Sequence, residues 1–283
     1  MSPTRRLPAA PLAHRSREFM DSTVARPLRI MAEYFDPLAR LQRANVAETI
    51  VLFGSARVSP HSKALAHLRK LERVSRGGRT PEQRVALREA RADLKMSRFY
   101  DDARELARRI TSWSRTLGEQ PRRFVICSGG GPGIMEAANR GAADAGGKTI
   151  GLGIKLPTEQ WPNRYISPEL NFNFHYFFMR KLWFAQLAKA LVVFPGGFGT
   201  MDELWEMLTL LQTGKLSRHN LVLIYGRRYW DQVLDWRAMV RWGTISESDY
   251  GLLKFADTVD EAFARVRENM ERYHMQLDGE WLD

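Results

Sequence analysis

Short apolar runs alternate with segments of helical character from residue 49 onward, and this alternation constrains the fold more than any other feature. Apolar runs at 50–53, 123–127, 149–154, 190–194 and 221–225 have the length of strands that are buried on both faces. A further strand is expected near 170–174, and helices are expected at 99–117, 134–145, 176–187, 201–212, 229–242 and 259–273. This order predicts a single-domain α/β fold with a Rossmann-like, doubly wound parallel sheet, whose ligands bind at the carboxyl ends of the strands.

Three regions lie outside the regular alternation. Residues 1–45 mix Pro, Arg and apolar clusters without a sustained period, so we expect a partly ordered N-terminal arm with one short helix at 31–41. The Rossmann-like domain then extends over 46–275 and contains a basic insertion at about 60–98. The insertion is interrupted by Gly77-Gly78 and Pro81, which predicts two helical segments that form a hairpin or lead into the next helix. Residues 276–283 are expected to form a C-terminal tail.

The formal net charge of +11 is concentrated in the arm and the insertion. Residues 1–45 carry 8 Lys+Arg against 4 Asp+Glu, and residues 57–98 carry 12 against 4, whereas residues 99–283 carry 23 of each sign. A contact between the insertion and nucleic acid or another polyanion is therefore one interpretation, and a solvated surface helix is the simpler one.

Composition narrows the class of protein further. The chain has no run of about 20 apolar residues and no apolar signal-peptide core, so we expect a cytoplasmic protein without membrane contact. The only cysteine, Cys127, ends an apolar run and is expected to be buried in a strand. No clustered His/Cys spacing is present, and we expect neither a metal site nor an organic cofactor.

Glycine-rich loops follow three of the expected strands. Their backbone N–H groups, together with the amino terminus of the following helix, suit the binding of a phosphate. The residues expected to contact the ligand are Gly54 and Ser55 in the first loop, Gly130 and Gly131 in the second, and Gly196, Gly197, Gly199 and Thr200 in the third.

None of these loops has the dinucleotide pattern G-x-G-x-x-G with an acidic residue about 20 positions on, and none is followed by a Walker lysine. This favours a mononucleotide over a dinucleotide cofactor or ATP hydrolysis. Glu203 is expected in the first turn of the helix after the third loop, with Glu206 one turn later, so the two carboxyls can couple and take different protonation states. Acidic residues are also common at helix starts for purely structural reasons.

With these loops and Met179-Arg180-Lys181 taken together, the chain resembles the Lonely Guy family of phosphoribohydrolases, formerly labelled lysine decarboxylases. The family's P-G-G-x-G-T-x-x-E motif is present at 195–203, and its Arg-Lys pair matches Arg180 and Lys181. The resemblance covers roughly residues 46–270. The chain departs from plant members at Phe177-Phe178-Met179, where those proteins carry Met-His-Glu, and its insertion is longer than in compact members.

The resemblance implies hydrolysis of the N-glycosidic bond of a purine nucleoside 5′-monophosphate, with AMP expected as substrate, to a free base and ribose 5-phosphate. Glu203 would stabilise the cationic sugar and orient water, and Arg180 would hold the nucleotide. Lys181 would bind substrate, and Glu136 would reach the base or ribose or have a structural role. The alternatives are the same reaction on a cytokinin riboside 5′-monophosphate, and a non-catalytic nucleotide-binding regulatory module.

The resemblance also implies a homodimer or higher homo-oligomer. The expected helix 201–212 places Leu204, Met207, Leu208 and Leu211 on one apolar stripe, and Trp183 and Phe184 add apolar surface nearby. The stripe is expected either to pack on the protein's own sheet or to meet a second subunit.

Overall fold

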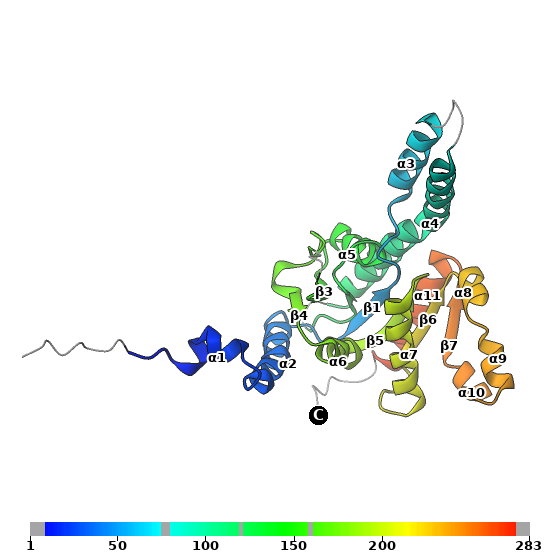
Figure 1. The fold of residues 1–283 in the computed structure, drawn as a ribbon. Helices are drawn as coiled ribbons and strands as arrows, with labels where there is room; N and C mark the ends of the chain where they lie inside the picture. The colour runs from blue at the N-terminus through cyan, green and yellow to red at the C-terminus, as the bar shows by residue number, and fades with distance from the viewer. Residues whose placement is uncertain (1–8, 75–79, 119–120, 158–160, 276–283) are drawn as a thin grey trace, which may run out of the picture.

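A seven-stranded parallel sheet forms the centre of the protein in a computed structural model, which describes residues 9–74, 80–118, 121–157 and 161–275 (Figure 1). The strand order is β4-β3-β2-β1-β5-β6-β7, and all neighbouring strands are parallel. The strands are β1 (Thr49–Phe53), β2 (Val125–Ser128), β3 (Thr149–Ile154), β4 (Asn171–Phe174), β5 (Ala188–Val193), β6 (Leu221–Tyr225) and β7 (Leu253–Ala256). The predicted Rossmann-like α/β fold is confirmed.

Helices cover both faces of the sheet, because successive side chains of a strand point to opposite sides and the central strands are apolar throughout. In β1, Val51 and Phe53 belong to one core cluster, whereas Ile50 and Leu52 belong to the other. The first cluster includes side chains of α2 (Arg26–Arg43), α6 (Phe177–Leu187), α7 (Phe198–Gln212), α8 (Arg227–Val233) and α9 (Trp236–Arg241). The second includes side chains of α4 (Pro81–Arg115), α5 (Ile134–Asp144) and α11 (Val259–Tyr273).

The apolar stripe of α7 packs within the chain itself. Leu204, Met207 and Leu211 are buried in the first core cluster, and Leu208 packs against it. Trp183 and Phe184 of α6 are buried in the same cluster. Of the two expected arrangements, packing on the protein's own sheet or contact with a second subunit, the stripe therefore adopts the first.

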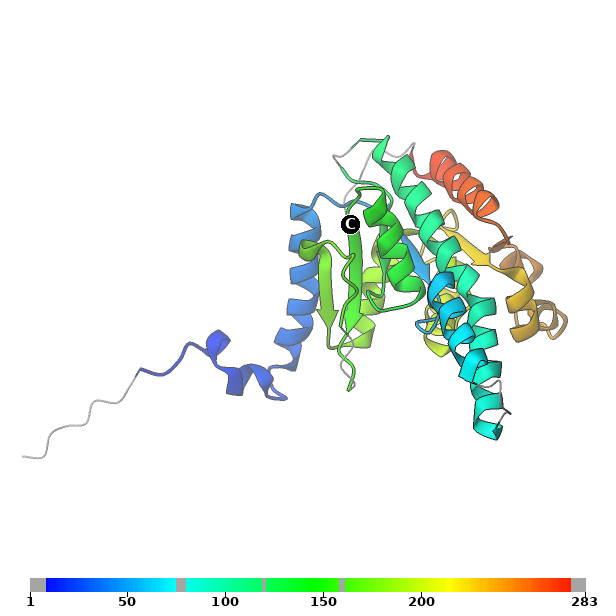
Figure 2. The same cartoon turned by 90° about the horizontal axis from the view of Figure 1, so that it is seen from above.

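Part of the N-terminal region is fixed to the body through α2, which is longer than the helix predicted at 31–41. The indole Nε1 of Trp183 donates to the carbonyl of Glu33 at 3.0 Å, and the Glu33 carboxylate accepts from the backbone N–H of His175 at 2.7 Å. Arg40 donates from Nη2 to the carbonyls of Glu169 and Asn171, both at 2.8 Å. The preceding η1 (Ala13–Arg15) and α1 (Arg17–Asp21) lie beyond the start of α2 and away from the sheet (Figures 1 and 2).

The insertion forms a helical hairpin of α3 (His61–Val74) and the first half of α4. The second predicted segment and the predicted helix 99–117 are one continuous helix, α4, of 35 residues. It begins at a capping box in which Thr80 and Gln83 exchange hydrogen bonds, so its start is well defined by sequence. The hairpin projects from the body in Figures 1 and 2.

The predicted helix 229–242 is wrong as a single element. It is divided into α8 and α9 at Leu234, which has an extended backbone, and the Asp235 side chain starts α9 by accepting from the N–H of Ala238 at 2.8 Å. The short η2 (Pro168–Leu170), α10 (Glu247–Tyr250) and β7 were not predicted. The predicted tail at 276–283 lies outside the described residues, and in the described part no helix is long and apolar enough to cross a membrane.

Candidate functional site

The three glycine loops meet at the carboxyl edge of the sheet, because they follow the adjacent central strands β2, β1 and β5. The first loop is hydrogen-bonded to the third loop and to the start of the helix that follows the second loop. Ser55 donates its backbone N–H to the carbonyl of Pro195 at 3.0 Å and accepts at its own carbonyl from Ile134 at 3.1 Å. The predicted convergence of the loops is therefore present in the structure.

Two groups of glycines have different surroundings in these loops. A Cβ on Gly54 would lie 2.7 Å from the Ile134 side chain, and one on Gly133, whose φ is +70°, would overlap the Ser55 carbonyl. These two glycines let the first and second loops pack together. By contrast, a Cβ on Gly197 or Gly199 would meet no heavy atom within 4 Å. The third loop thus presents open backbone, as a phosphate requires.

The third loop leads directly into α7, which begins at Phe198. Gly197 is the N-cap residue, and no side chain caps the helix. The N–H groups of the first turn therefore lack a side-chain cap and point from a helix of 15 residues, which gives the geometry that binds phosphate. Gly196 packs against the side chain of Thr200, which is buried in that first turn.

A cavity of about 310 Å³ opens beside the second loop. Gly130 and Gly131, two of the predicted binding residues, line it together with Arg180. Its other walls include Met135, Gly153, Trp161, Phe172 and Asn173. The volume is at the lower end of the range for small-molecule sites.

Arg180 supplies the positive charge of this cavity. Its Nε donates to the carbonyl of Leu152 at 2.9 Å, and its guanidinium lies 5.2 Å from the ring centre of Phe184. A Cβ on Gly129 would lie 2.7 Å from Nη2, so the guanidinium lies directly against the second loop. Burial lowers the pKa of the Arg180 guanidinium below its ordinary value, and the charge of the neighbouring Glu203 opposes that shift.

Lys181 extends to the carboxylates of α7. Its Nζ lies 2.8 Å from both Asp202 Oδ2 and Glu206 Oε2, and 3.8 Å from Glu203 Oε2. Burial disfavours the charge of Lys181, but the hydrogen bonds to Asp202 and Glu206 outweigh it and raise the pKa. Its nearest charged partners are thus acidic side chains of this protein.

Glu203 is a buried carboxyl group, 5% exposed. Burial raises its pKa to about 7, the charges of Lys181 and Arg180 oppose that shift, and Glu206 adds to it. The predicted coupling with Glu206 is present, but burial is the larger cause. Because α7 begins three residues before the predicted start, Glu203 lies in the second turn, where the helix dipole is weaker. A carboxyl group that exchanges its proton near neutral pH can act as a general base or acid.

Glu136 lies on α5 and lines a neighbouring cavity of about 400 Å³, which shares Trp161 and Pro162 with the first. It accepts a hydrogen bond from the hydroxyl of Tyr100 at 2.7 Å. This contact supports the structural alternative for Glu136.

A buried polar network that was not predicted supports the second loop. Asn139 Oδ1 accepts from the Ser128 hydroxyl at 2.7 Å and from Asn163 Nδ2 at 2.8 Å. The same hydroxyl accepts from the N–H of Gly130 at 3.1 Å, and the Gly130 carbonyl accepts from the N–H of Asn163 at 2.8 Å. The sequence signal was a polar residue, Asn139, among the apolar positions of α5.

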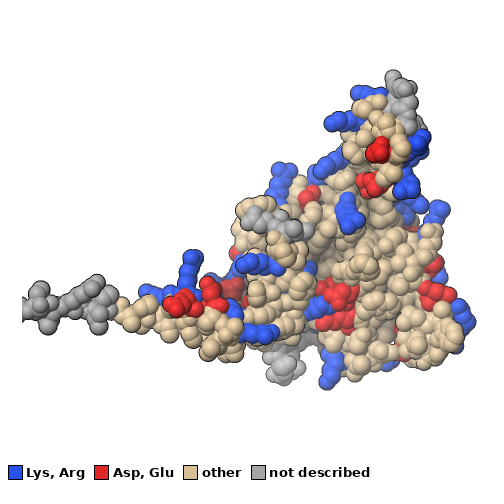
Figure 3. All heavy atoms as spheres, in the orientation of Figure 1, with Lys and Arg blue, Asp and Glu red and all other residues tan. Residues whose placement is uncertain are grey.

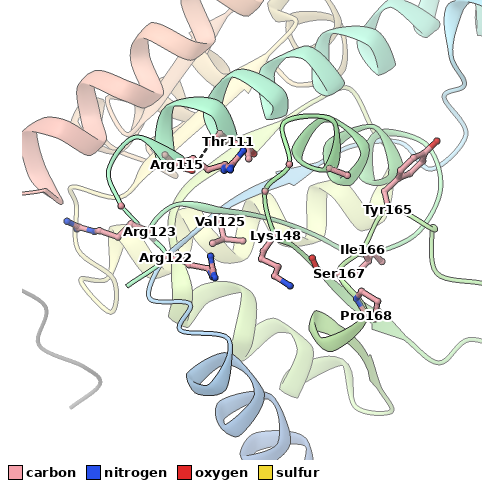
Figure 4. A pocket seen from close by; sticks show the side chains of 15 residues that line it. Thr111, Arg115, Arg122, Arg123, Val125, Lys148, Tyr165, Ile166, Ser167 and Pro168 are labelled. Carbon is pink, nitrogen blue, oxygen red and sulfur yellow. Dashed lines mark hydrogen bonds between the residues drawn. The ribbon is translucent and has the colours of Figure 1, made fainter. Parts of the chain in front are cut away.

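A further cavity, of about 560 Å³, lies at the opposite edge of the sheet, where α4 and α5 end (Figure 4). Arg115, Arg123 and Lys148 line it, but they contact the Ala145 carbonyl, the Glu48 carboxylate and the Glu169 carboxylate, respectively. These cations neutralise helix carboxyl ends and acids of the protein itself. The glycine-loop edge remains the better candidate for the site.

Among the described residues, no group of three or more His, Cys, Asp or Glu side chains could hold a metal ion. Cys127 is buried in β2 as predicted, and burial raises the pKa of its thiol. Arg180, Lys181, Glu203, Asn173 and the backbone of the loops are among the polar groups at the candidate site.

Comparison with known proteins agrees with the motifs. Residues 135–266 match a family model described as "Possible lysine decarboxylase". The chain is 26% identical over 159 residues to the cytokinin riboside 5′-monophosphate phosphoribohydrolase LOG of Oryza sativa subsp. japonica. That match covers 54% of this chain and 63% of the rice protein, so it spans less than two thirds of the relative.

Two solved structures that match the chain are described as molybdenum cofactor proteins. The Moco carrier protein of Chlamydomonas reinhardtii is 20% identical, with 80% of this chain and 98% of that chain covered and a TM-score of 0.44. The molybdenum cofactor binding protein of Rippkaea orientalis is 17% identical, with 59% and 87% covered and a TM-score of 0.40. The family model and the rice relative confirm the resemblance to the Lonely Guy family that was predicted from the sequence.

Proposed function

We propose that this protein hydrolyses the N-glycosidic bond of a nucleoside 5′-monophosphate, with AMP as substrate, and releases the free base and ribose 5-phosphate. The observation that carries the proposal is the buried carboxyl of Glu203, with its pKa near 7, on the helix that follows an open, uncapped glycine loop. The rice phosphoribohydrolase supports the reaction class.

Each part of the site has a role in this reaction. The N–H groups at the start of α7 bind the 5′-phosphate, and the open space at Gly197 and Gly199 lets it approach the backbone. Cleavage at ribose passes through an oxocarbenium-like state, which a nearby carboxylate stabilises. Glu203 in its ionised form supplies that charge and orients the attacking water, and Arg180 holds the nucleotide in the cavity.

The decisive experiment incubates the purified protein with AMP, GMP, CMP and N6-isopentenyl-AMP and follows the released base by chromatography, with adenosine as the phosphate-free control. We expect release from AMP and slow or no release from adenosine. Binding of AMP without release of adenine would show a nucleotide-binding module instead.

A second candidate substrate is a cytokinin riboside 5′-monophosphate, the substrate class in the name of the rice relative. Trp161, Phe172 and Met135 give the cavity an apolar wall that suits a hydrophobic N6 substituent. A higher kcat/KM for N6-isopentenyl-AMP than for AMP would favour this candidate.

A further inference from the structure

The α3–α4 hairpin is a projecting element with a small core of its own. Leu68 of α3 packs with Leu87 and Ala90 of α4, and Leu71 and Leu94 extend the contact. At the base of the hairpin, His61 Nδ1 and Ser97 Oγ are 3.1 Å apart. From Phe99 onward, α4 is buried against the body, so the segment before it contributes mainly to the hairpin.

The exposed surface of this half of α4 is divided by charge. Five basic side chains follow one another at intervals of four and three residues, and all five are exposed; they are Arg84, Arg88, Arg91, Lys95 and Arg98, named here the basic row. At about 100° per residue, this spacing places them within about 80° of the helix circumference and along about 21 Å of its axis. The acidic residues of the same segment, Glu82, Glu89 and Asp93, are displaced by about 140–180° from Arg84.

In the part of the chain that the structure describes, most side chains of the basic row are not paired with an acidic residue. Within the described residues, one ion pair joins it to an acid, Arg91 Nη2 to Glu72 Oε1 at 3.8 Å, and the two side chains are 59% and 44% exposed. Arg98 lies over the ring of Phe99 at 4.5 Å and near the carboxyl of Asp102. Lys and Arg side chains are prominent on the projecting hairpin in Figure 3. A solvated helix would be stabilised by mixing the two signs along its faces, whereas separation of the signs creates a directional positive field.

The inner end of the row lies at the carboxyl edge of the sheet. The ring of Phe99, next to Arg98, contacts the position where a Cβ of Gly226 would lie, and that position is also 3.4 Å from Pro195 of the third glycine loop. The row therefore leads from the outer part of the hairpin toward the rim of the nucleotide site.

We propose that the basic row binds the phosphate backbone of nucleic acid. The row is about one side chain wide, which suits a linear chain of phosphates better than a planar anionic surface such as a membrane. Its length of about 21 Å equals the axial rise of about six phosphates on one strand of B-DNA. Guanidinium groups bind phosphate oxygens through paired hydrogen bonds. Contacts to phosphate oxygens carry no sequence information, so binding through them is independent of base sequence.

The test measures binding of the full chain to a fluorescent duplex of about 20 base pairs by anisotropy, at salt concentrations from about 50 to 200 mM. Five phosphate contacts give a slope of about −4.5 in a plot of log K against log salt, which is a loss of several hundredfold in affinity over this range. The triple variant Arg84→Gln, Arg88→Gln, Lys95→Gln is expected to reduce the magnitude of the slope by about 2.7.

The matched control is Lys63→Gln, Lys70→Gln, Arg73→Gln, which removes three exposed charges from α3 of the same hairpin. It is expected to keep the slope of the unmodified protein. Both triple variants are expected to keep their circular dichroism and Tm, because all six side chains are exposed. The single variants Arg84→Gln and Arg88→Gln, each expected to change the slope by about 0.9, repeat the test with smaller perturbation.

Three results would overturn the proposal: no binding at about 50 mM salt, an equal loss in the α3 control, or row-dependent binding to phosphatidylserine vesicles without binding to the duplex. The measurement contains no nucleotide substrate. Its outcome is therefore independent of whether the protein hydrolyses AMP.

Discussion

Arg180 and Lys181 are adjacent on α6, but their side chains contact different parts of the protein. Arg180 donates to the Leu152 carbonyl and lines the cavity below the second glycine loop, whereas Lys181 contacts Asp202, Glu206 and Glu203 on α7. One cation thus remains available to a ligand, and the other lowers the cost of placing three carboxyl groups close together. This division leaves Glu203 with a raised pKa although a lysine and an arginine are near it.

Replacement of Glu203 by Gln is expected to reduce base release from AMP by at least about 100-fold while nucleotide binding is retained. The substitution removes the charge that stabilises the sugar cation but changes little volume. Single-turnover kinetics and isothermal titration with AMP measure the two quantities separately. A variant that loses binding but keeps its turnover per bound complex would contradict the assigned role.

The rate is expected to rise with pH and to level off above about pH 7, because the ionised form of Glu203 is the active one and its pKa is about 7. The pH dependence of kcat/KM for AMP measures this. In Glu206→Gln the midpoint is expected to move to lower pH, since the charge of Glu206 contributes to raising the pKa of Glu203. If the substitution leaves the midpoint unchanged, the pH dependence does not arise from the carboxyl groups of α7.

The same carboxyl links stability to pH. The folded protein holds the Glu203 proton up to about pH 7, whereas the unfolded chain releases it near its ordinary pKa of about 4.3, so the free energy of unfolding decreases as pH rises between these values. The full cost above pH 7 is on the order of 3 kcal/mol. Glu203→Gln is therefore expected to raise Tm more at pH 8 than at pH 4. An equal change in Tm at both pH values would show that ionisation of the buried Glu203 does not destabilise the folded protein.

Strands β1, β2, β3, β5 and β6 could be predicted because each contains a short apolar run next to glycine or helix signals. The four residues of β7 contain Lys254, and its pattern is too short to be distinguished from a loop. The division at Leu234 coincides with the N-cap at Asp235, and the apolar periodicity alone did not separate the two helices from one continuous helix. At the site, motifs predicted the convergence of the loops, but not that Lys181 contacts α7 or that Trp161 and Phe172 line the cavity. Those contacts join segments far apart in the chain, which periodicity does not place.

Two glycines of the loops provide a matched pair of substitutions. Gly199→Val is expected to weaken AMP binding by at least about tenfold and to leave Tm nearly unchanged, because a Cβ there has open space in the protein but enters the proposed phosphate position. Gly133→Ala is expected to destabilise the fold, since its φ is +70° and its Cβ would overlap the Ser55 carbonyl. Calorimetry and nucleotide titration of both variants test this. Normal AMP binding by Gly199→Val would show that the phosphate does not bind at the start of α7.

The last prediction concerns assembly, which we propose to be a homodimer or higher homo-oligomer through α2 and α6. These helices pack together through Tyr34 and Trp183, whose ring centres are 5.6 Å apart, and both expose large apolar side chains. The exposed side chains are Leu28, Met31 and Phe35 on α2, and Phe177, Phe178 and Leu182 on α6, each between 41% and 54% exposed. An apolar surface of this kind on neighbouring helices is typical of an interface between subunits.

Light scattering is expected to give at least the mass of a dimer for the unmodified protein, and a monomer for Phe178→Asp combined with Leu182→Asp. Both side chains are about half exposed in the monomer. These substitutions therefore perturb the fold less than substitutions in the buried stripe of α7 would. Trp242→Asp is the matched control, because Trp242 is 85% exposed just after α9 and lies on neither helix, and this variant is expected to keep the mass of the unmodified protein. An unmodified protein that is monomeric and active at assay concentration would contradict the proposed assembly, and a double variant that keeps its mass would show that subunits meet elsewhere than on α6.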